Sequence, residues 1–263
     1  MPDKKTLQSV VRTFTVLELL DEYGELGITE ISEMLSFDKS TVFRIISTLK
    51  SLGYVAQNPF NSKYSNSYKL FEIGSNVARK TGLPQLAYPF MHELSKATGE
   101  AVNLAVRDGT KALYISKIES TDTIKVCMNL GQTIPLYCTA LGKSLIAFLP
   151  ENGVRELLRN ERFIQYTSNT IKDIETLLRE LKEVRRLGYS VDNEEHIKNI
   201  YCIGAPIFDV SNNVIAALSL ALPKFRFDEN PRREDLYYLV RDTARRFSCT
   251  LGWHDNMKLE AFG

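Results

Sequence analysis

Three features are scarce in this 263-residue sequence: metal-ligand clusters, long apolar runs and net charge. The four cysteines form no C-x-x-C pair and the three histidines are scattered, so no zinc-type spacing is present. The longest apolar runs, such as residues 214–222, are far too short to span a membrane, and the N-terminus has no apolar stretch of the signal-peptide type. These absences predict a cytoplasmic protein that contacts no membrane and uses no metal or other cofactor.

The composition is that of an ordinary globular protein. Hydrophobic residues make up 44% of the chain and charged residues 25%, so a sizeable core can form without disulfides or metals. A length of 263 residues suits two domains better than one.

The net charge of +1 conceals a local basic block. Residues 1–35 hold three basic and seven acidic side chains, whereas residues 36–80 hold seven basic and two acidic ones, a net charge of +5. Positive charge concentrated in one segment is the electrostatic footprint of a nucleic-acid-binding surface. A chance cluster on a solvated face would give the same count.

The first 71 residues are predicted to form a winged helix-turn-helix DNA-binding domain. Apolar residues at helical spacing run through 7–20, a short second helix covers 29–35, and a third follows a tight turn and covers 38–53. Turn-forming residues then separate a strand at 54–55 from a returning strand at 68–71. Three helices followed by a hairpin are the pattern of this motif.

The third predicted helix has one apolar face and one short polar face, as a helix in the major groove requires. Arginine can bond guanine through two hydrogen bonds, and serine or threonine can contact bases or phosphates. The predicted DNA-binding residues are Lys39, Ser40, Thr41, Arg44 and Thr48 on the helix, with Lys63 and Tyr64 at the tip of the wing. The alternative is an ordinary amphipathic helix with a solvated face.

Beyond a predicted helical linker at 72–98, the hydrophobic period changes from helical to two. The dipeptide Asp108-Gly109 signals a hairpin between two strands, and further strands and helices follow. Strands are expected at 101–108, 111–120, 123–129, 188–193, 200–209 and 214–222, and helices at about 136–149, 151–159, 171–187 and 231–251. Strands grouped before and after a set of helices indicate an α+β domain, here 99–255, with an antiparallel sheet.

Small residues on the last two strands indicate a cavity. Side chains alternate across a sheet, so Ala217, Ser219 and Ala221 share one face, opposite the face of Val214 and the leucines at 218, 220 and 222. Cys202 and Gly204 share a face of the neighbouring strand. Together these small residues leave room for a ligand, although they would equally allow a helix to pack closely.

Two further features suit a ligand near that cavity. Asp192 lies on strand 188–194 and can accept hydrogen bonds from a ligand hydroxyl, unless it belongs to a solvated strand end. Segment 131–143 passes from loop into helix with Thr139 as the expected cap, and a helix N-terminus favours an anion such as a carboxylate.

The sequence also resembles a known family. The segments "LQSVVRTFTVLELL", "ITEISEMLSFDKSTVFRIISTLKSLGYV" and "YKLFEIG" resemble the N-terminal domain of IclR-type bacterial transcription regulators, and "LGQTIPLYCTALGKSLIAFLP" and "GYSVDNEEHIKNIYCIGAPIFDVSNNVIAALSLALP" resemble their effector-binding domain. The match spans nearly the whole chain in the expected order. The resemblance implies a GAF-like effector domain that binds a small organic or sugar acid, and dimers, often paired into tetramers, with 72–98 as the dimerisation segment.

The resemblance also implies a set of effector-binding residues. By motif they are Ala140, Leu141, Asp192, Cys202 and Ser219, and the apolar wall would include Leu130, Leu136 and Ile200. Where the family often has a second polar group, two residues after Ser219, this chain has Ala221. One polar contact to the ligand is therefore expected to be missing.

The predicted function is that of a transcription regulator, with repression preferred to activation, that binds a pseudo-palindromic operator in double-stranded DNA as a homodimer or homotetramer. A small-molecule carboxylate would control that binding. Two alternatives stay open. Cys202 or Cys138, with His196 nearby in sequence, could serve as the nucleophile of an enzyme acting on a small metabolite. The winged helix could also serve protein contacts alone.

Overall fold

The structure, a computed structural model, describes residues 6–126 and 128–254. The chain divides between Thr81 and Gly82 into two compact units, and each is described by itself. No helix in these described ranges is long and apolar enough to cross a membrane.

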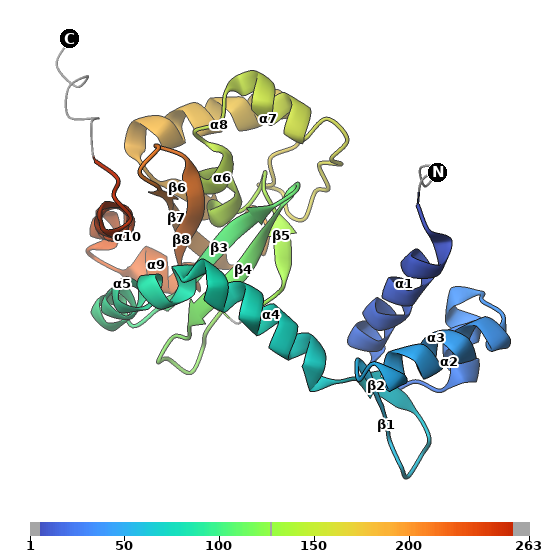
Figure 1. Cartoon of the computed structure of the whole chain (residues 1–263). Coiled ribbons are helices and arrows are strands. Elements are labelled where there is room, and N and C mark those ends of the chain that lie inside the picture. The colour runs from blue at the N-terminus through green and yellow to red at the C-terminus, as the bar shows by residue number, and fades with distance from the viewer. Residues whose placement is uncertain (1–5, 127, 255–263) are drawn as a thin grey trace. The chain divides into compact units, whose positions relative to one another are not determined.

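The first unit is a winged helix-turn-helix, as predicted (Figure 1). Its elements are α1 (Gln8–Tyr23), α2 (Ile28–Leu35), α3 (Lys39–Ser51), β1 (Val55–Gln57), β2 (Tyr64–Asn66) and α4 (Tyr68–Thr81). The three leading helices enclose a core, and β1 and β2 pair antiparallel to form the wing. The most deeply buried core residues are Val16, Leu20, Ile31, Val42 and Ile46.

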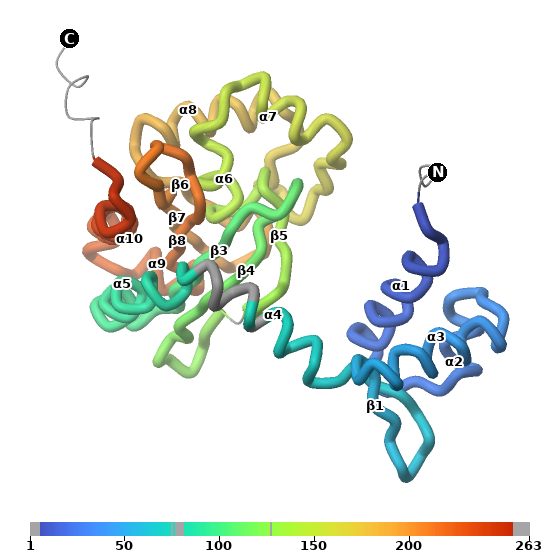
Figure 2. Tube along the Cα trace, viewed as in Figure 1, coloured from blue at the N-terminus to red at the C-terminus, as the bar shows by residue number. Residues whose placement is uncertain are grey.

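The returning strand of the wing ends earlier than predicted. Residues 68–71 begin α4 instead of completing a strand (Figure 2), and Tyr68 is 91% exposed. Ser67 explains the change, because its hydroxyl accepts a hydrogen bond from the Lys69 amide at 3.2 Å and so caps the new helix. At α2 the expected cap Thr29 is also replaced, since the helix follows Gly27, whose amide donates to the Glu30 carboxylate.

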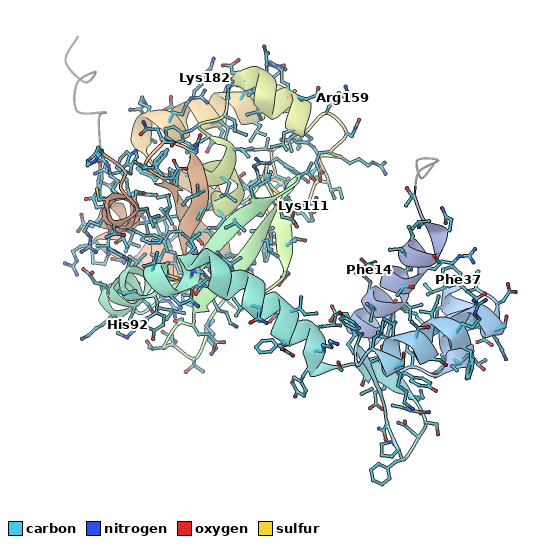
Figure 3. The ribbon with its side chains drawn as sticks, in the orientation of Figure 1. Phe14, Phe37, His92, Lys111, Arg159 and Lys182 are labelled. Atoms are coloured by element: carbon cyan, nitrogen blue, oxygen red, sulfur yellow. The ribbon has the colours of Figure 1, made fainter. Side chains whose placement is uncertain are left out.

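The apolar stripe of α1 is buried only in its second half. Leu17 and Leu20 pack into the core, whereas Leu7, Val10 and Phe14 are 70%, 47% and 59% exposed, and Phe14 stands on the surface of α1 in Figure 3. Helical spacing identifies the apolar face of a helix but not how much of it the domain's own core covers. The first two turns of α1 therefore present an apolar surface to their surroundings.

The second unit is built on a six-stranded antiparallel sheet with the order β5-β4-β3-β8-β7-β6, which confirms the predicted α+β class. Its strands are β3 (Ala101–Asp108), β4 (Lys111–Ile118), β5 (Thr133–Pro135), β6 (Ser190–Asn193), β7 (Ile200–Phe208) and β8 (Val214–Pro223). Two hydrophobic clusters, one on each face, hold helices against this sheet. The sheet is thus the middle layer of three.

The helices divide between the two faces. One face carries α5 (Leu83–Thr98), α9 (Lys224–Glu229) and α10 (Arg233–Thr250), and the other carries α6 (Ala140–Ile146), α7 (Glu151–Leu157) and α8 (Ile174–Leu187). Figure 1 shows α6 lying between the sheet and the α7–α8 pair. Helix α6 therefore separates the sheet from the outer helices.

Three sequence predictions for this unit were wrong. The described residues of 123–129 form no strand, and the edge of the sheet is β5 instead; Cys127 lies outside the described residues. Helix α9 was not expected. Val214 packs with the α6-side cluster and not with the leucines of its strand, because Ile207 pairs with Ala216 and Phe208 with Val214. The extra residue, Ile215, is a bulge that reverses the alternation.

Helix α6 lies unusually close to its neighbours because two glycines have no side chain. A Cβ on Gly204 of β7 would lie 2.7 Å from the Ala140 carbonyl oxygen, and a Cβ on Gly142 would lie 2.4 Å from the Leu136 Cα. Both distances are far below van der Waals contact with backbone atoms that cannot move aside cheaply. Backbone therefore packs on backbone on both sides of α6.

We expect Gly142→Ala to destabilise the second unit by roughly 1–3 kcal/mol, the usual cost of overpacking, although alanine is the better helix former. Gly153→Ala in α7 is the matched control, since its Cβ would meet only the Pro150 side chain at 3.7 Å. The fluorescence of Trp253, the single tryptophan and a buried one, reports urea unfolding of this unit. Equal midpoints for the two variants would contradict the account of α6.

Candidate functional site

The polar face of α3 is exposed where a recognition helix meets DNA. Val42, Ile46 and Leu49 bury the opposite face in the core. Of the predicted contacts, Thr41 is half-buried and the others on this helix are exposed, namely Lys39, Ser40, Arg44 and Thr48. The Thr48 hydroxyl donates to the Arg44 carbonyl at 2.8 Å, so its hydrogen bond is made within the helix.

The turn before α3 is held by local bonds that fix how the helix is presented. Ser36 adopts the left-handed conformation with φ of 55°. The Ser32 hydroxyl donates to the Phe37 carbonyl at 2.6 Å, and the Phe37 amide donates back to the Ser32 carbonyl at 3.1 Å. This short, bonded connection between α2 and α3 is the turn of the helix-turn-helix.

The two residues predicted at the wing tip lie elsewhere. The Lys63 ammonium bonds the Glu30 carboxylate of α2 at 2.8 Å. Tyr64 exchanges two backbone hydrogen bonds with Leu26 and packs against the core. The hairpin turn falls at 59–61, where Phe60 is 96% exposed. The tip is thus displaced from its predicted position by several residues, because alternation fixes strands but not the turn between them.

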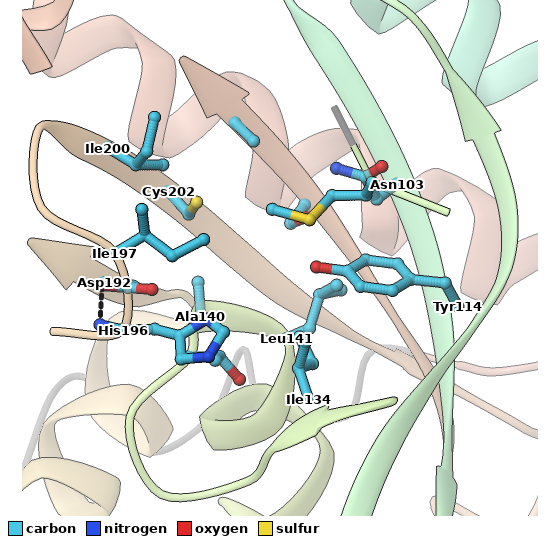
Figure 4. Close-up of a pocket in the computed structure, with 14 residues that line it drawn as sticks. Asn103, Tyr114, Ile134, Ala140, Leu141, Asp192, His196, Ile197, Ile200 and Cys202 are labelled. Carbon is cyan, nitrogen blue, oxygen red and sulfur yellow. Dashed lines mark hydrogen bonds between the residues drawn. The ribbon is translucent and has the colours of Figure 1, made fainter. Parts of the chain in front are cut away.

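In the second unit, six of the eight residues predicted for the effector site line one cavity (Figure 4): Ala140, Leu141, Asp192, Ile200, Cys202 and Ser219. Ala221 lines it as well. Leu130 does not, because it sits in the turn before β5 and is 57% exposed. Leu136 is fully buried in the core beside α6 and also lies outside the lining.

Strand register explains why residues so distant in sequence meet. Asp192 pairs with Cys202, Cys202 with Ala221, and Ser219 with Asn103 across four neighbouring strands. Residues paired across antiparallel strands point to the same face. Two adjacent rows of small and polar side chains therefore lie under α6, one with Asp192, Cys202 and Ala221 and the next with Ser219 and Asn103.

Three polar lining residues were missed from the sequence. Asn103 is a buried polar residue in the otherwise apolar segment 101–106 of β3, which was a readable signal. Tyr114 comes from β4 and faces the same cavity. His196 comes from the loop after β6, where no periodic pattern exists to reveal it. Figure 4 shows Asn103 and Tyr114 on one side of the cavity and Asp192 and His196 on the other.

Among the described residues that line the cavity, Asp192 carries the carboxyl group, and the pKa of this carboxyl is near neutrality. It is 5% exposed, and one oxygen accepts hydrogen bonds from the amides of Glu195 at 2.7 Å and His196 at 3.4 Å. Burial, and next the Glu195 charge, raise the Asp192 pKa to about 7, against the lowering effect of those bonds. Burial lowers the pKa of His196. The cavity therefore carries between zero and one negative charge.

A buried ion pair fastens the loop after β6. Lys143 of α6 is fully buried, and its ammonium lies 2.5 Å from the Glu195 carboxylate and 3.4 Å from that of Glu180 on α8. Burial raises the pKa of Glu195, and its second oxygen has no hydrogen-bond partner within the described residues. Because breaking a buried pair leaves an uncompensated charge, this contact holds the loop against α6 firmly.

The Cys202 thiol is unsuited to nucleophilic chemistry. Burial, with the charges of Asp192 and Glu195 adding to it, raises its pKa well above the ordinary value. Burial likewise raises the pKa of Cys138. A catalytic cysteine needs a thiolate and hence a lowered pKa. The raised pKa values of both thiols therefore give the enzyme alternative no support.

The chain has a winged helix-turn-helix followed by an α+β unit with a small, partly polar cavity. This is the arrangement of two-domain transcription regulators. Residues 9–59 match the family model for the IclR helix-turn-helix domain, and residues 75–249 match the one for the bacterial transcriptional regulator IclR C-terminal domain. The chain belongs to the IclR family of DNA-binding transcription regulators, which are not enzymes.

Curated relatives and solved structures agree with this assignment. The chain is 38% identical to the HTH-type transcriptional regulator KdgR of Escherichia coli over 95% of both proteins. It is 33% identical to the E. coli HTH-type transcriptional repressor AllR over 95% of this chain and 92% of that protein. The crystal structure of the Thermotoga maritima IclR is 32% identical, with a TM-score of 0.77 over 94% of this chain and all of that one.

A more distant structure shares the fold. It is described as an IclR homolog complexed with 4-hydroxybenzoate from Microbacterium hydrocarbonoxydans, and it is 21% identical with a TM-score of 0.79 over 92% of this chain and 97% of that one.

The raised pKa of Asp192 predicts a pH-dependent stability. Between about pH 4 and 7 the folded protein keeps a proton on Asp192 that the unfolded chain loses, so this group lowers the free energy of unfolding as pH rises through that window. Asp192→Asn keeps the accepting oxygen and removes the titration. We expect the free energy of unfolding of the variant to rise, relative to that of the wild type, by on the order of 1 kcal/mol per pH unit from pH 5 to 7.

Urea titrations at several pH values, followed by Trp253 fluorescence, measure this difference. Because the Glu195 charge raises the Asp192 pKa, the difference between the two proteins reports the Asp192 titration together with its coupling to Glu195. A constant difference between them from pH 5 to 8 would show that Asp192 does not titrate in this range.

Proposed function

We propose that this protein is a repressor whose binding to a pseudo-palindromic operator is controlled by a small hydroxylated organic acid, such as a sugar acid, held in the cavity under α6. The observation that carries the proposal is the division of polar groups in that cavity, with donors at one end and Asp192 at the other. The relative AllR is named as a repressor, and a neighbour of the same fold binds 4-hydroxybenzoate, which supports a repressor with an acid effector.

The end of the cavity that carries hydrogen-bond donors suits a carboxylate. Asn103, Tyr114 and Ser219 are each at most 5% exposed, and their side-chain polar groups have no hydrogen-bond partner among the described residues. Because these three side chains line the cavity, a ligand or an ordered water in it can accept hydrogen bonds from them. The described lining holds no lysine or arginine. The acid would therefore be bound by neutral donors and not by an ion pair.

The opposite end suits hydroxyl groups. Asp192 retains an oxygen that accepts no hydrogen bond among the described residues, and Cys202 lies beside it on β7. An ionised Asp192 would repel a carboxylate, which favours placing the acid group at the far end of the cavity. An effector with an acid group at one end and hydroxyls at the other satisfies both ends.

Entry of the effector requires the loop at 194–199 to move. The cavity holds free space of only about 20 Å³, roughly enough for one water molecule. His196 and Ile197 of this loop form part of its lining, and Glu194 and Asn199 at its ends have φ of 57° and 64°. Opening the loop would strain the ion pair between Lys143 and Glu195. Because Lys143 belongs to α6 and also pairs with Glu180 of α8, effector binding would act on both helices.

Operator recognition implies more than one subunit, because a single recognition helix reads too few base pairs. The exposed apolar turns of α1 and the segment 72–98, where Ile73 and Leu86 are 43% and 53% exposed, are proposed as dimer surfaces. A homodimer or homotetramer acting on chromosomal DNA in the cytoplasm follows from this proposal. The same proposal assigns residues 1–71 to the DNA-binding domain, 72–98 to the helical linker and 99–255 to the effector-binding domain.

Arg44→Ala is expected to weaken binding to the preferred duplex about 10- to 100-fold, the discrimination of one bidentate contact with guanine. Arg159→Ala is the matched control, since Arg159 is an exposed arginine of the second unit (Figure 3) whose 3.6 Å pair with Glu156 is solvated. Fluorescence anisotropy against a duplex selected in vitro by the wild-type protein measures both. Equal affinity for wild type and Arg44→Ala would refute the assignment of α3.

Ser219→Ala is expected to weaken effector binding about 10- to 100-fold, because one carboxylate oxygen would be left unpaired in a buried site. The effector is first sought by thermal shift among sugar acids, keto acids and aromatic acids, and its affinity is then measured by calorimetry. Ser211→Ala, an exposed serine in the turn before β8, is the control. Unchanged affinity in Ser219→Ala would place the acid group elsewhere.

A further inference from the structure

We propose that Phe60, at the tip of the wing, is a neutral DNA contact that enters the minor groove beside the site read by α3. Phe60 is 96% exposed, the highest exposure among the large hydrophobic residues of the described chain. Phenylalanine is one of the apolar side chains that proteins insert between base steps of the minor groove. The inference rests on the assignment of α3 as the recognition helix.

The turn that carries Phe60 is held by its own hydrogen bonds. The Phe60 amide donates to the Asn58 side-chain oxygen at 2.9 Å, and the Lys63 amide donates to the Asn61 side-chain oxygen at 2.9 Å. The Asn58 and Asn61 amide groups both donate to the Glu25 carboxylate, at 3.0 and 2.9 Å. Because the backbone of the turn is fixed in this way, the ordering cost of binding falls mainly on the Phe60 side chain itself.

The wing tip is also linked to the recognition helix. The Lys50 ammonium of α3 donates to the Gln57 side-chain oxygen of β1 at 2.7 Å, and the Gln57 amide group donates to the Ser62 carbonyl at 3.2 Å. Figure 1 shows the β1–β2 hairpin projecting beyond α2 and α3 within this unit. Phe60 is therefore placed at a set position relative to Arg44.

The charge around the tip favours DNA over another protein surface as the partner. Residues 52–71 contain two lysines and no aspartate or glutamate. The two nearby carboxylates, Glu25 and Glu30, already accept hydrogen bonds from Asn58, Asn61, Lys63 and the Gly27 amide. Lys63 neutralises Glu30 by an ion pair, whereas the groups that bond Glu25 are neutral, so the tip carries little net charge and the large group that it presents is an uncharged ring.

The test compares Phe60→Ala, Phe60→Leu and Tyr68→Ala on the full-length protein, with the duplex selected in vitro by the wild type as probe. Tyr68 is the matched control because it is another aromatic residue of the same unit, 91% exposed but outside the wing. Affinity is measured by anisotropy over a range of salt concentrations. A duplex with 2-aminopurine at each position flanking the selected site reports unstacking.

We expect Phe60→Ala to bind roughly tenfold more weakly at every salt concentration, with the slope of log affinity against log salt unchanged, since no charge is lost. Phe60→Leu should retain most of the affinity and the 2-aminopurine signal that the wild type induces. Tyr68→Ala should bind as the wild type does.

Wild-type affinity in Phe60→Ala, an equal loss in Tyr68→Ala, or the absence of any 2-aminopurine signal with the wild type would overturn the proposal. A change in oligomeric state of Phe60→Ala by sedimentation, with unchanged DNA affinity, would also overturn it and identify a second copy of the chain as the partner. If Arg44→Ala also binds like the wild type, the assignment of α3 fails; if only Phe60→Ala does, the inference about the wing alone fails.

Discussion

The effector unit depends on the contact between the backbone of α6 and the backbone of β7 at Gly204. Because Gly204 has no side chain, the carbonyl of Ala140 can approach the strand, and the Ser190 hydroxyl bonds this same carbonyl at 2.6 Å. The first turn of α6 is thereby fixed over the sheet, next to Cys202 and Ser219. A side chain at Gly204 would push α6 outward and displace the wall that Ala140 and Leu141 form, so the cavity depends on this backbone packing as well as on the loop at 194–199.

Helix α6 also carries, on Lys143, the positive charge that balances the carboxyl groups on the Asp192 side of the cavity. Lys143 lies one turn beyond Ala140 and is wholly buried, so it must be paired, and its partner Glu195 belongs to the loop that covers Asp192. Asp192 in turn accepts the amide of Glu195. Two carboxyl groups and one ammonium therefore form a single coupled set. A group that binds the other oxygen of Asp192 therefore changes the electrostatics of the carboxyl group that also holds the loop.

The sequence predicted those parts of the structure that have a period or a strong local signal. The Asp108-Gly109 turn, the polar face of α3 and the small residues of β7 and β8 are of this kind, and they lie as expected. The misplaced parts lack such a signal. Leu130 and the wing tip are in turns, where side-chain direction depends on the loop's own hydrogen bonds, and the same holds for His196, whose place in the lining was missed. Val214 was misplaced because a bulge at Ile215 has no mark in the sequence.

The sheet itself connects the cavity to the helix that follows the junction between the two units. Alternation along β7 and β8 points Cys202 and Ser219 into the cavity, while Ile203, Leu218 and Leu220 point to the other face and pack in the cluster that includes Leu83 and Leu94 of α5. Gly82, which has a φ of 65° and open space where a side chain would lie, separates α5 from α4. Strands β7 and β8 therefore contact the cavity on one face and the cluster that holds α5 on the other.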